Sequence, residues 1–150
     1  MLIHELKRRD CLDLLRQARY GRLACAQYEQ PYVVPFFFYL DESSESLFSF
    51  STLGQKIEWM RLNPRVCVEV DEIVDQYNWT TVVVFGRYKE LKDSKKDEPA
   101  RRRAYELFQQ RAAWWLPGTG KAESSPEHHT PIIYRITIDK ISGRRAAKTT

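Results

Sequence analysis

Short apolar runs alternate with polar turns along most of the chain, at a spacing typical of antiparallel strands. Six segments have this character, and they are residues 22–27, 32–40, 46–51, 66–70, 79–91 and 132–138. In 66–70, valine alternates with other residues, which indicates a strand with one buried face. The polar linkers 28–31 and 41–45 predict hairpin turns. Gly86 predicts a bulge or a bend in the longest strand.

Three helices are predicted between these strands. The first is expected to begin at an Asp10 cap and to end at Gly21. The second follows Thr52 and Gln55, whose three-residue spacing fits a capping box, and ends at the next Asn-Pro pair. The third is predicted over 99–115, where apolar residues recur on one face and are expected to pack on the sheet.

Six strands with helices inserted irregularly predict an antiparallel barrel that is closed or partly closed, and a mixed fold in which β structure dominates. The length of 150 residues favours a single domain over 1–150. Residues 118–130 are rich in small and polar residues and are predicted to form a mobile loop, either a lid or a connector. The basic tail, 144–150, is predicted to be frayed.

Composition narrows the class of protein. With 43% hydrophobic and 29% charged residues, the chain has the balance of a folded globular domain. The longest apolar stretch, 33–40, is too short for a membrane helix and contains a proline, so no membrane span is expected. The charged N-terminal segment does not resemble a secretory signal, so we expect a cytoplasmic protein.

The remaining composition excludes other classes of site. Three widely spaced cysteines predict neither a disulfide framework nor a zinc ribbon. The net charge of +4 is dispersed, and acidic residues interleave with the basic cluster at 95–103, which favours a solvated helix face over a nucleic-acid partner. His128 and His129 are adjacent in a predicted loop and define no coordination geometry, so no metal site is expected.

The most informative stretch runs from the strand at 46–51 into the second helix. Ser51 and Thr52 provide hydroxyls, Gly54 leaves room for a ligand, and Lys56 lies in the first turn after Gln55. Free backbone N–H groups and the helix dipole converge on the same place, which suits a phosphate monoester. A capped surface helix with an incidental lysine would have the same local pattern, so the spacing alone leaves both interpretations open.

Three segments in order, PYVVPFFF, LFSFSTLGQKIEWMRLNPRVCVEVDE and NWTTVVVFGRYKEL, resemble the pyridoxamine 5′-phosphate oxidase-like FMN-binding split-barrel proteins. The resemblance is to the small subgroup that includes nitroimidazole-resistance proteins. It covers residues 11–91 well and the last strand loosely. It implies a six-stranded split barrel with flanking helices, an obligate homodimer, and two FMN molecules in clefts at the subunit interface.

The resemblance also assigns cofactor contacts to named positions. Ser51, Thr52, Gln55 and Lys56 match the phosphate-binding turn of the family. The strand along the isoalloxazine edge, where contacts are largely through backbone groups, matches Val34, Pro35 and Phe36. Thr81 matches a position that places a polar side chain near the flavin. No catalytic side chain is implied, since the flavin would carry out the electron or hydride transfer.

Two departures from the family limit the activity that the resemblance implies. Nitroimidazole-resistance members often carry a histidine before the phosphate turn, where this chain has Ser49, Phe50 and Ser51. True pyridoxamine-phosphate oxidases have Arg-Lys in the turn and an Arg and His near the C-terminus, where this chain has Gln55 and a Tyr-Arg pair at 134–135. Neither nitroimidazole reduction nor vitamin B6 oxidation is therefore expected.

The sequence thus predicts an FMN-binding oxidoreductase that acts on an unidentified small molecule. Alternatives with the same barrel are a non-catalytic flavin store, a haem binder, a protein with a vestigial pocket, and a deazaflavin-dependent reductase. A nucleic-acid-binding barrel that stacks bases on Tyr32, Phe36 and Phe38 is the least favoured. Trp114 and Trp115 would either cover the cofactor or pack in the fold or an interface.

Overall fold

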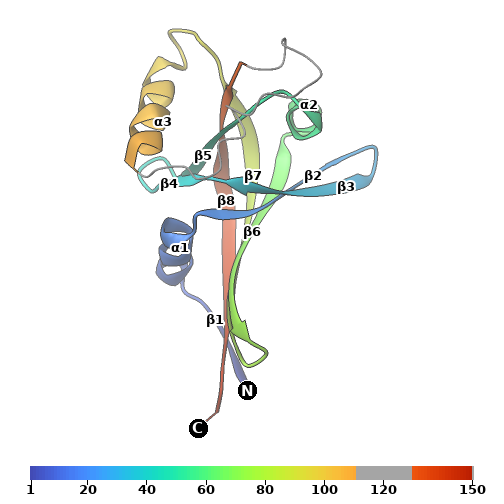
Figure 1. Cartoon of the computed structure of the whole chain (residues 1–150), viewed down its shortest axis with the longest axis vertical. Helices are drawn as coiled ribbons and strands as arrows, with labels where there is room; N and C mark the ends of the chain where they lie inside the picture. Colours follow the sequence, from blue (N-terminus) through green and yellow to red (C-terminus); the bar gives the residue numbers. More distant parts are fainter. Residues whose placement is uncertain (111–129, 150) are drawn as a thin grey trace.

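The computed structural model describes residues 1–110 and 130–149 and has one antiparallel sheet with three helices (Figure 1). The strands follow the order β3-β2-β6-β7-β8-β5-β4, and β1 pairs with the far end of β8. The elements are β1 (Leu2–Glu5), α1 (Arg8–Gln17), β2 (Tyr20–Gln27), β3 (Gln30–Phe37), β4 (Tyr39–Asp41), β5 (Ser46–Ser51), α2 (Gln55–Leu62), β6 (Arg65–Asp75), β7 (Asn78–Leu91), α3 (Glu98–Gln110) and β8 (Ile132–Ala147).

The sheet has eight strands where the sequence predicts six. The predicted strand 32–40 is interrupted at Phe38, because β3 pairs with β2 while β4 turns away to pair with β5. β1 is exposed along its whole length and so carries no apolar periodicity. Despite these differences the predicted class is confirmed, since the sheet is antiparallel and dominates the fold.

The prediction of a frayed basic tail over 144–150 is wrong for residues 144–147. β8 continues to Ala147, with Arg144 paired with Thr81 on β7 and with Glu5 on β1. Backbone pairing on both sides holds this segment in the sheet, although its side chains are basic and mostly exposed. The tail is therefore a structural strand with charged side chains.

The helix boundaries differ from those predicted, for identifiable reasons. Lys7 occupies the N-cap of α1, Asp10 lies inside the first turn, and the helix ends at Ala18. Gly21 lies in β2, where a Cβ would be only 2.8 Å from the carbonyl oxygen of Glu69, so close packing requires the glycine. The start of α2 is also not the predicted capping box, because the chain stays extended through its N-cap residue and no side chain caps it.

Two other predictions about the sheet are confirmed. Val66, Val68 and Val70 are buried on β6, with more exposed residues between them. The pairing of β7 with β8 shifts register between Phe85 and Gly86, which is the predicted bulge. A Cβ on Gly86 would lie 2.4 Å from a backbone oxygen of β8.

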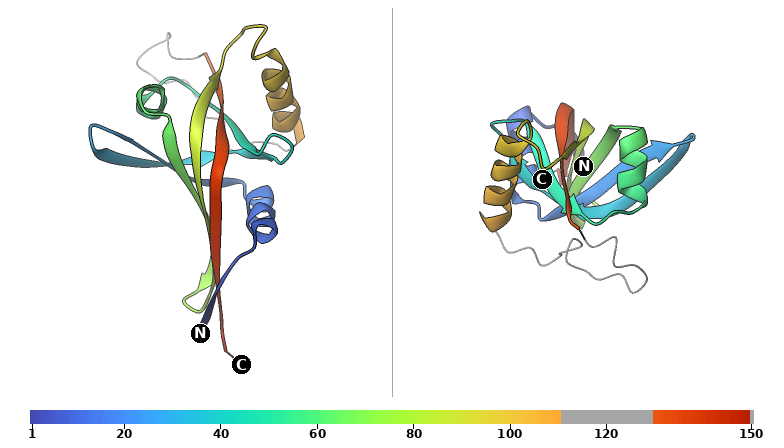
Figure 2. Two further views of the ribbon diagram at one scale, coloured as in Figure 1. Left: turned by 180° about the vertical axis from the view of Figure 1, so that it is seen from behind. Right: turned by 90° about the horizontal axis from the view of Figure 1, so that it is seen from above.

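Two hydrophobic clusters hold the helices on the sheet. The larger cluster lies on the inner face, where side chains of β2, β6, β7 and β8 pack with α1 and α2. The smaller cluster joins α3 to β4, β5 and β8, which confirms the predicted packing of that helix through Ala104 and Leu107. Figure 2 shows α2 and α3 on opposite sides of the long strands β7 and β8. The predicted helix beyond residue 110, with Trp114 and Trp115, lies outside the described residues.

The ends of β6, β7 and β8, together with β1, extend past α1 as a narrow arm that carries both termini (Figures 1 and 2). Gly143 faces α1, since a Cβ there would lie 2.8 Å from the Cys11 sulfur. The opposite face of β7 and β8 carries Phe85 and Lys140, which are exposed. In the described part of the chain no helix has the length and apolar character to cross a membrane.

Candidate functional site

The junction between β5 and α2 contains four of the predicted cofactor-binding residues: Ser51, Thr52, Gln55 and Lys56. The first main-chain bond of α2 runs from Glu58 N–H to the Gly54 carbonyl at 3.1 Å, so the three preceding amides have no acceptor within the helix. A Cβ on Gly54 would meet nothing within 4 Å, so the outer side of the turn at Gly54 is open. The junction thus offers backbone donors to an anion.

Lys56 is half-buried at this junction. Burial lowers the pKa of its ammonium group, and the neighbouring Cys25 opposes this shift. Lys56 makes no ion pair with any residue in the described ranges. An unpaired, partly desolvated ammonium beside free amides is what an anion-binding site requires, and the fold alone does not account for it.

β2, β3 and α2 come together next to this lysine. Asn63, at the end of α2, donates a hydrogen bond from its side-chain amide to the Ala26 carbonyl at 2.9 Å. The rings of Tyr32 and Trp59 lie 5.6 Å apart, which joins β3 to α2. The start of β3 therefore packs against α2, the helix that begins at the predicted phosphate turn.

The pairing of β3 with β2 limits which of its backbone groups can contact a cofactor. This strand lies at one end of the strand order, and Pro35 pairs with Arg22 of β2. Because proline has no N–H, this pair is of the non-hydrogen-bonded kind, and the Pro35 carbonyl points away from β2. Val34 and Phe36 then direct their backbone groups toward β2, and the Phe36 side chain is in the core. Among these three residues, Pro35 has the free carbonyl.

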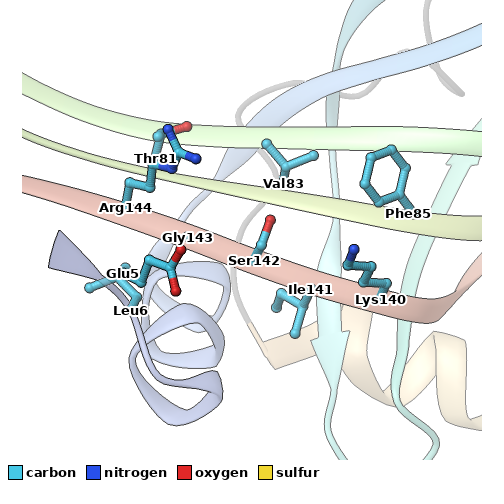
Figure 3. A pocket seen from close by; sticks show the side chains of 10 residues that line it. All are labelled: Glu5, Leu6, Thr81, Val83, Phe85, Lys140, Ile141, Ser142, Gly143 and Arg144. Carbon is cyan, nitrogen blue, oxygen red and sulfur yellow. The ribbon is translucent and has the colours of Figure 1, made fainter. Parts of the chain in front are cut away.

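Thr81 lies on another part of the sheet. Its hydroxyl donates a hydrogen bond to Glu69 at 3.2 Å, and it lines an open groove of about 720 Å³ on β7, β8 and the end of β1 (Figure 3). Three strand spacings, about 14 Å across a sheet, separate β7 from β3, and Pro35 is in register with Val83, two residues along β7 from Thr81. A compact group cannot contact both residues, whereas a cofactor that lies across the sheet or between two chains can.

The acidic pair beside Thr81, formed by Glu69 and Asp71, is not among the site residues predicted from the sequence. Burial, together with the nearby Asp71, raises the pKa of Glu69, and the Thr81 hydroxyl and Arg22 oppose this shift. The strand alternation at 66–70 was the available signal, since it predicts that Glu69 lies on the face opposite the buried valines. Two close carboxylates on one face form an electrostatically strained cluster.

The other candidate clusters have structural roles. Arg101 donates to the Leu91 carbonyl at 2.8 Å, Arg102 pairs with Glu98, and Arg103 binds Asp41, which supports the interpretation of this cluster as part of the helix surface. In the part of the chain that the structure describes, no group of three potential metal ligands occurs. His128 and His129 lie outside the described residues, as does nearly all of the predicted loop 118–130.

Comparison with known proteins places this geometry in a family. The model of the family described as pyridoxamine 5′-phosphate oxidase matches residues 7–145. An uncharacterized protein of Rhizobium meliloti strain 1021 is 34% identical over 150 residues, which cover 97% of each chain. A FAD-binding protein from Mesorhizobium loti has a similar structure, with a TM-score of 0.80 and 41% identity over 98% of this chain and 100% of that one.

A more distant structure has the same fold. It is a protein of Bacteroides thetaiotaomicron provisionally assigned to 5-nitroimidazole resistance, with 17% identity, a TM-score of 0.67, and coverage of 99% of this chain and 93% of that one. The family model spans nearly the whole chain, from the residue before α1 to two residues before the end of β8. This chain is therefore a member of the pyridoxamine 5′-phosphate oxidase family.

Proposed function

We propose that this protein binds a flavin, and that FMN is the form it binds. The observation that carries the proposal is the half-buried Lys56 ammonium, which has no ion pair in the described ranges and lies in the first turn of α2. The FAD-binding relative from Mesorhizobium loti supports a flavin, and FAD has the same flavin and first phosphate as FMN.

The residues at the junction fit the phosphate end of the cofactor. Lys56 provides the positive charge, the first-turn amides of α2 donate hydrogen bonds, and Thr52 contributes a further hydroxyl. The Ser51 hydroxyl donates to the Thr52 carbonyl at 3.1 Å, so it orders the turn and leaves its oxygen as an acceptor.

The flavin, when bound, supplies the electron-transfer chemistry, and the chain positions it and sets its electrostatic surroundings. The Pro35 carbonyl at the free edge of β3 can accept a hydrogen bond from the ring edge. The Thr81 hydroxyl, which donates to Glu69, keeps its oxygen as a further acceptor on another part of the sheet or in a second subunit. These residues hold and orient the cofactor, and no nucleophile with its base is needed.

The full proposal is a homodimeric, cytoplasmic oxidoreductase that acts on a small molecule, with the flavin at the subunit interface. Three free cysteines, of which two are buried, suit a reducing compartment. The three strand spacings between β3, which carries Pro35, and β7, which carries Thr81, support a cofactor shared across a wide surface, and not one enclosed within a single barrel.

An absorbance spectrum of the purified protein, followed by mass spectrometry of the released cofactor, tests the proposal. A flavin spectrum and the mass of FMN are expected, and oxidation of NADH or NADPH by the loaded protein would support an oxidoreductase. Release of FAD would correct the cofactor form. Release of a deazaflavin, a haem spectrum, or a colourless protein that does not bind added FMN would each refute the flavin proposal.

A further inference from the structure

Two basic residues lie side by side on neighbouring strands, away from the junction of β5 and α2. Lys89 of β7 is opposite Arg135 of β8 in the sheet register, so both side chains leave the same face of the sheet. Like charges in this arrangement repel each other and destabilise a sheet. The pair therefore requires a compensating interaction.

This pair lies on the side of the sheet that packs against α3. Tyr134 and Ile136, the chain neighbours of Arg135, belong to the larger cluster, so Arg135 leaves the opposite face. Its row continues to Phe48 of β5, which belongs to the smaller cluster with α3. Because α2 and α3 lie on opposite sides of β7 and β8 (Figure 2), the pair is separate from the predicted phosphate turn at the start of α2.

Arg135 has no hydrogen-bond or ion-pair partner within residues 1–110 and 130–149. Its Nε atom is buried and has no acceptor within hydrogen-bond distance. A guanidinium stays protonated in proteins and keeps its five N–H donors, so burying part of it without an acceptor costs free energy. The contacts of the described chain do not account for this cost.

The other arginines of this region do have acceptors. Arg87, two residues along β7 from the pair, forms two hydrogen bonds of 2.9 Å to Asp139. Arg101 of α3 donates to a carbonyl of β7 at 2.8 Å, and Arg103 pairs with Asp41 at 3.2 Å. The carboxylates of Asp41 and Asp139 are thus already bound to other arginines.

Within 4 Å of the pair, the described residues include one carboxylate, which belongs to Asp97. One of its oxygens lies 3.9 Å from the Lys89 ammonium, a distance longer than a hydrogen bond. Its other oxygen accepts a hydrogen bond from the Lys92 amide at 2.9 Å, and the Asp97 amide donates to the Ser94 hydroxyl at 3.3 Å. Asp97 therefore orders the turn before α3 and leaves the donors of the pair without an acceptor.

We propose that Lys89 and Arg135 bind a phosphate group, in an anion site that is distinct from the flavin site. A phosphate monoester carries a charge of about −1.5 to −2 near pH 7, which balances two cations. The planar guanidinium presents paired N–H donors to two phosphate oxygens, and the ammonium acts beside it as a point charge. A carboxylate would neutralise only one of the two charges, so it fits the pair less well.

NMR of the nitrogen-15-labelled full chain tests the site through the Arg135 Nε–H resonance, which is identified by its loss in Arg135→Gln. The titration uses Lys56→Met, so that the turn before α2 does not contribute its ammonium. Inorganic phosphate should shift this resonance in a saturable way, with a dissociation constant in the millimolar range. Chloride at equal ionic strength should not shift it, and acetate should bind more weakly. An unchanged resonance in phosphate, or equal binding of acetate, would overturn the proposal.

A second variant tests whether the two cations act together. Lys89→Gln should weaken phosphate binding at Arg135 about tenfold, because one charge-assisted contact is removed. Lys95→Gln is the matched control, since Lys95 is exposed on the connection before α3 and the change in net charge is the same. This control should bind phosphate with unchanged affinity. Equal weakening by both variants would show a general effect of net charge and would refute the site.

Urea unfolding in the Lys56→Met background separates a binding role of Arg135 from a structural one. Phosphate should raise the urea midpoint more than chloride does at equal ionic strength, because a ligand that binds only the folded state stabilises it. Arg135→Gln should lose this gain. Without phosphate this variant should be at least as stable as its parent, because the repulsion from Lys89 is removed. A large loss of stability in both buffers would make the guanidinium structural and contradict the proposal.

Glycerol 3-phosphate identifies the source of the phosphate group. Tighter binding than that of inorganic phosphate would support the site with a phosphate ester as its ligand, and equal binding would support it with free phosphate. The resonance reports on Arg135 and does not depend on flavin. A flavin-binding chain without a phosphate shift refutes this inference alone, whereas a phosphate shift in a chain that binds no flavin supports it and refutes only the proposed function.

Discussion

Replacement of Lys56 by methionine should separate the contribution of its charge to flavin binding from its contribution to the stability of the fold. Methionine keeps the length and apolar contacts of the lysine side chain and removes the ammonium. In the apo-protein this charge is partly desolvated and has no ion pair among the described residues, so its removal should leave the fold equally stable or stabilise it by about 1 kcal/mol. In the flavin complex the same change removes a contact to the phosphate.

The expected loss of affinity follows from the kind of bond removed. A hydrogen bond to a charged group contributes about 1.5–3 kcal/mol, which corresponds to a roughly 10- to 160-fold rise in the dissociation constant of FMN. Riboflavin, which lacks the phosphate, should bind equally weakly to the wild type and to Lys56→Met. Urea unfolding of the apo-protein and quenching of flavin fluorescence measure the two effects separately.

The pH dependence of binding provides a further check on Lys56. Burial lowers the pKa of Lys56 in the free protein, and a bound phosphate would raise it. Affinity is then full below the free-state pKa and is lost as the pH rises through the free and bound values. The loss should begin at a lower pH than for an ordinary lysine, and Lys56→Met should not show it.

Lys96→Met is the matched control, because Lys96 is exposed on the connection before α3. This variant should bind FMN with wild-type affinity. If Lys56→Met binds FMN as tightly as the wild type, the phosphate site has been placed wrongly. If it retains weak binding but unfolds at a much lower urea concentration, the ammonium has a structural role that the described contacts do not show.

Three further variants test the packing of the fold by urea unfolding. Gly86→Ala should destabilise it by about 2–3 kcal/mol, because the new methyl group would lie 2.4 Å from the Thr137 oxygen; an unchanged midpoint would contradict the bulge geometry. Tyr134→Phe should be neutral or stabilising by about 1 kcal/mol, because the buried hydroxyl has no hydrogen-bond partner among the described residues. Burial raises the pKa of Asp41, but hydrogen bonds from Ser44, Ser43 and Arg103 outweigh this effect and lower it overall. Its carboxylate therefore stabilises the fold above the unfolded pKa near 3.8, and this stabilisation is lost as the pH falls further. Asp41→Asn should lower the free energy of unfolding by about 1–2 kcal/mol at pH 7, and the stability of this variant should fall less steeply than that of the wild type as the pH is lowered.

The sequence predicts those parts of the fold that depend on local periodicity. Alternation at 66–70 identified the buried face of β6, and the segment 46–51 matches β5 at both ends. What it misses depends on tertiary pairing. Nothing local shows that β8 continues through two arginines, because the partners that hold it there, β1 and β7, are far away in the chain.

The candidate site likewise has a part that local sequence predicts and a part that depends on tertiary pairing. Ser51 to Lys56 are contiguous, so their proximity could be predicted, and the structure adds the burial and isolation of the lysine. The distance from Pro35 to Thr81 depends on the strand order, which no local pattern specifies. The proximity of Glu69 and Asp71 to Thr81 becomes visible only when the register aligns β6 with β7.

The two prolines of β3 have a consequence for solubility. Pro31 and Pro35 are four residues apart, so both would direct an N–H toward the free edge of the strand if they were other residues. Because proline has no N–H, this edge lacks two donors that an approaching strand from another molecule would need. At the other end of the sheet, β4 is only three residues long and packs against α3. An open sheet with both ends blocked in this way resists edge-to-edge aggregation without closing into a barrel.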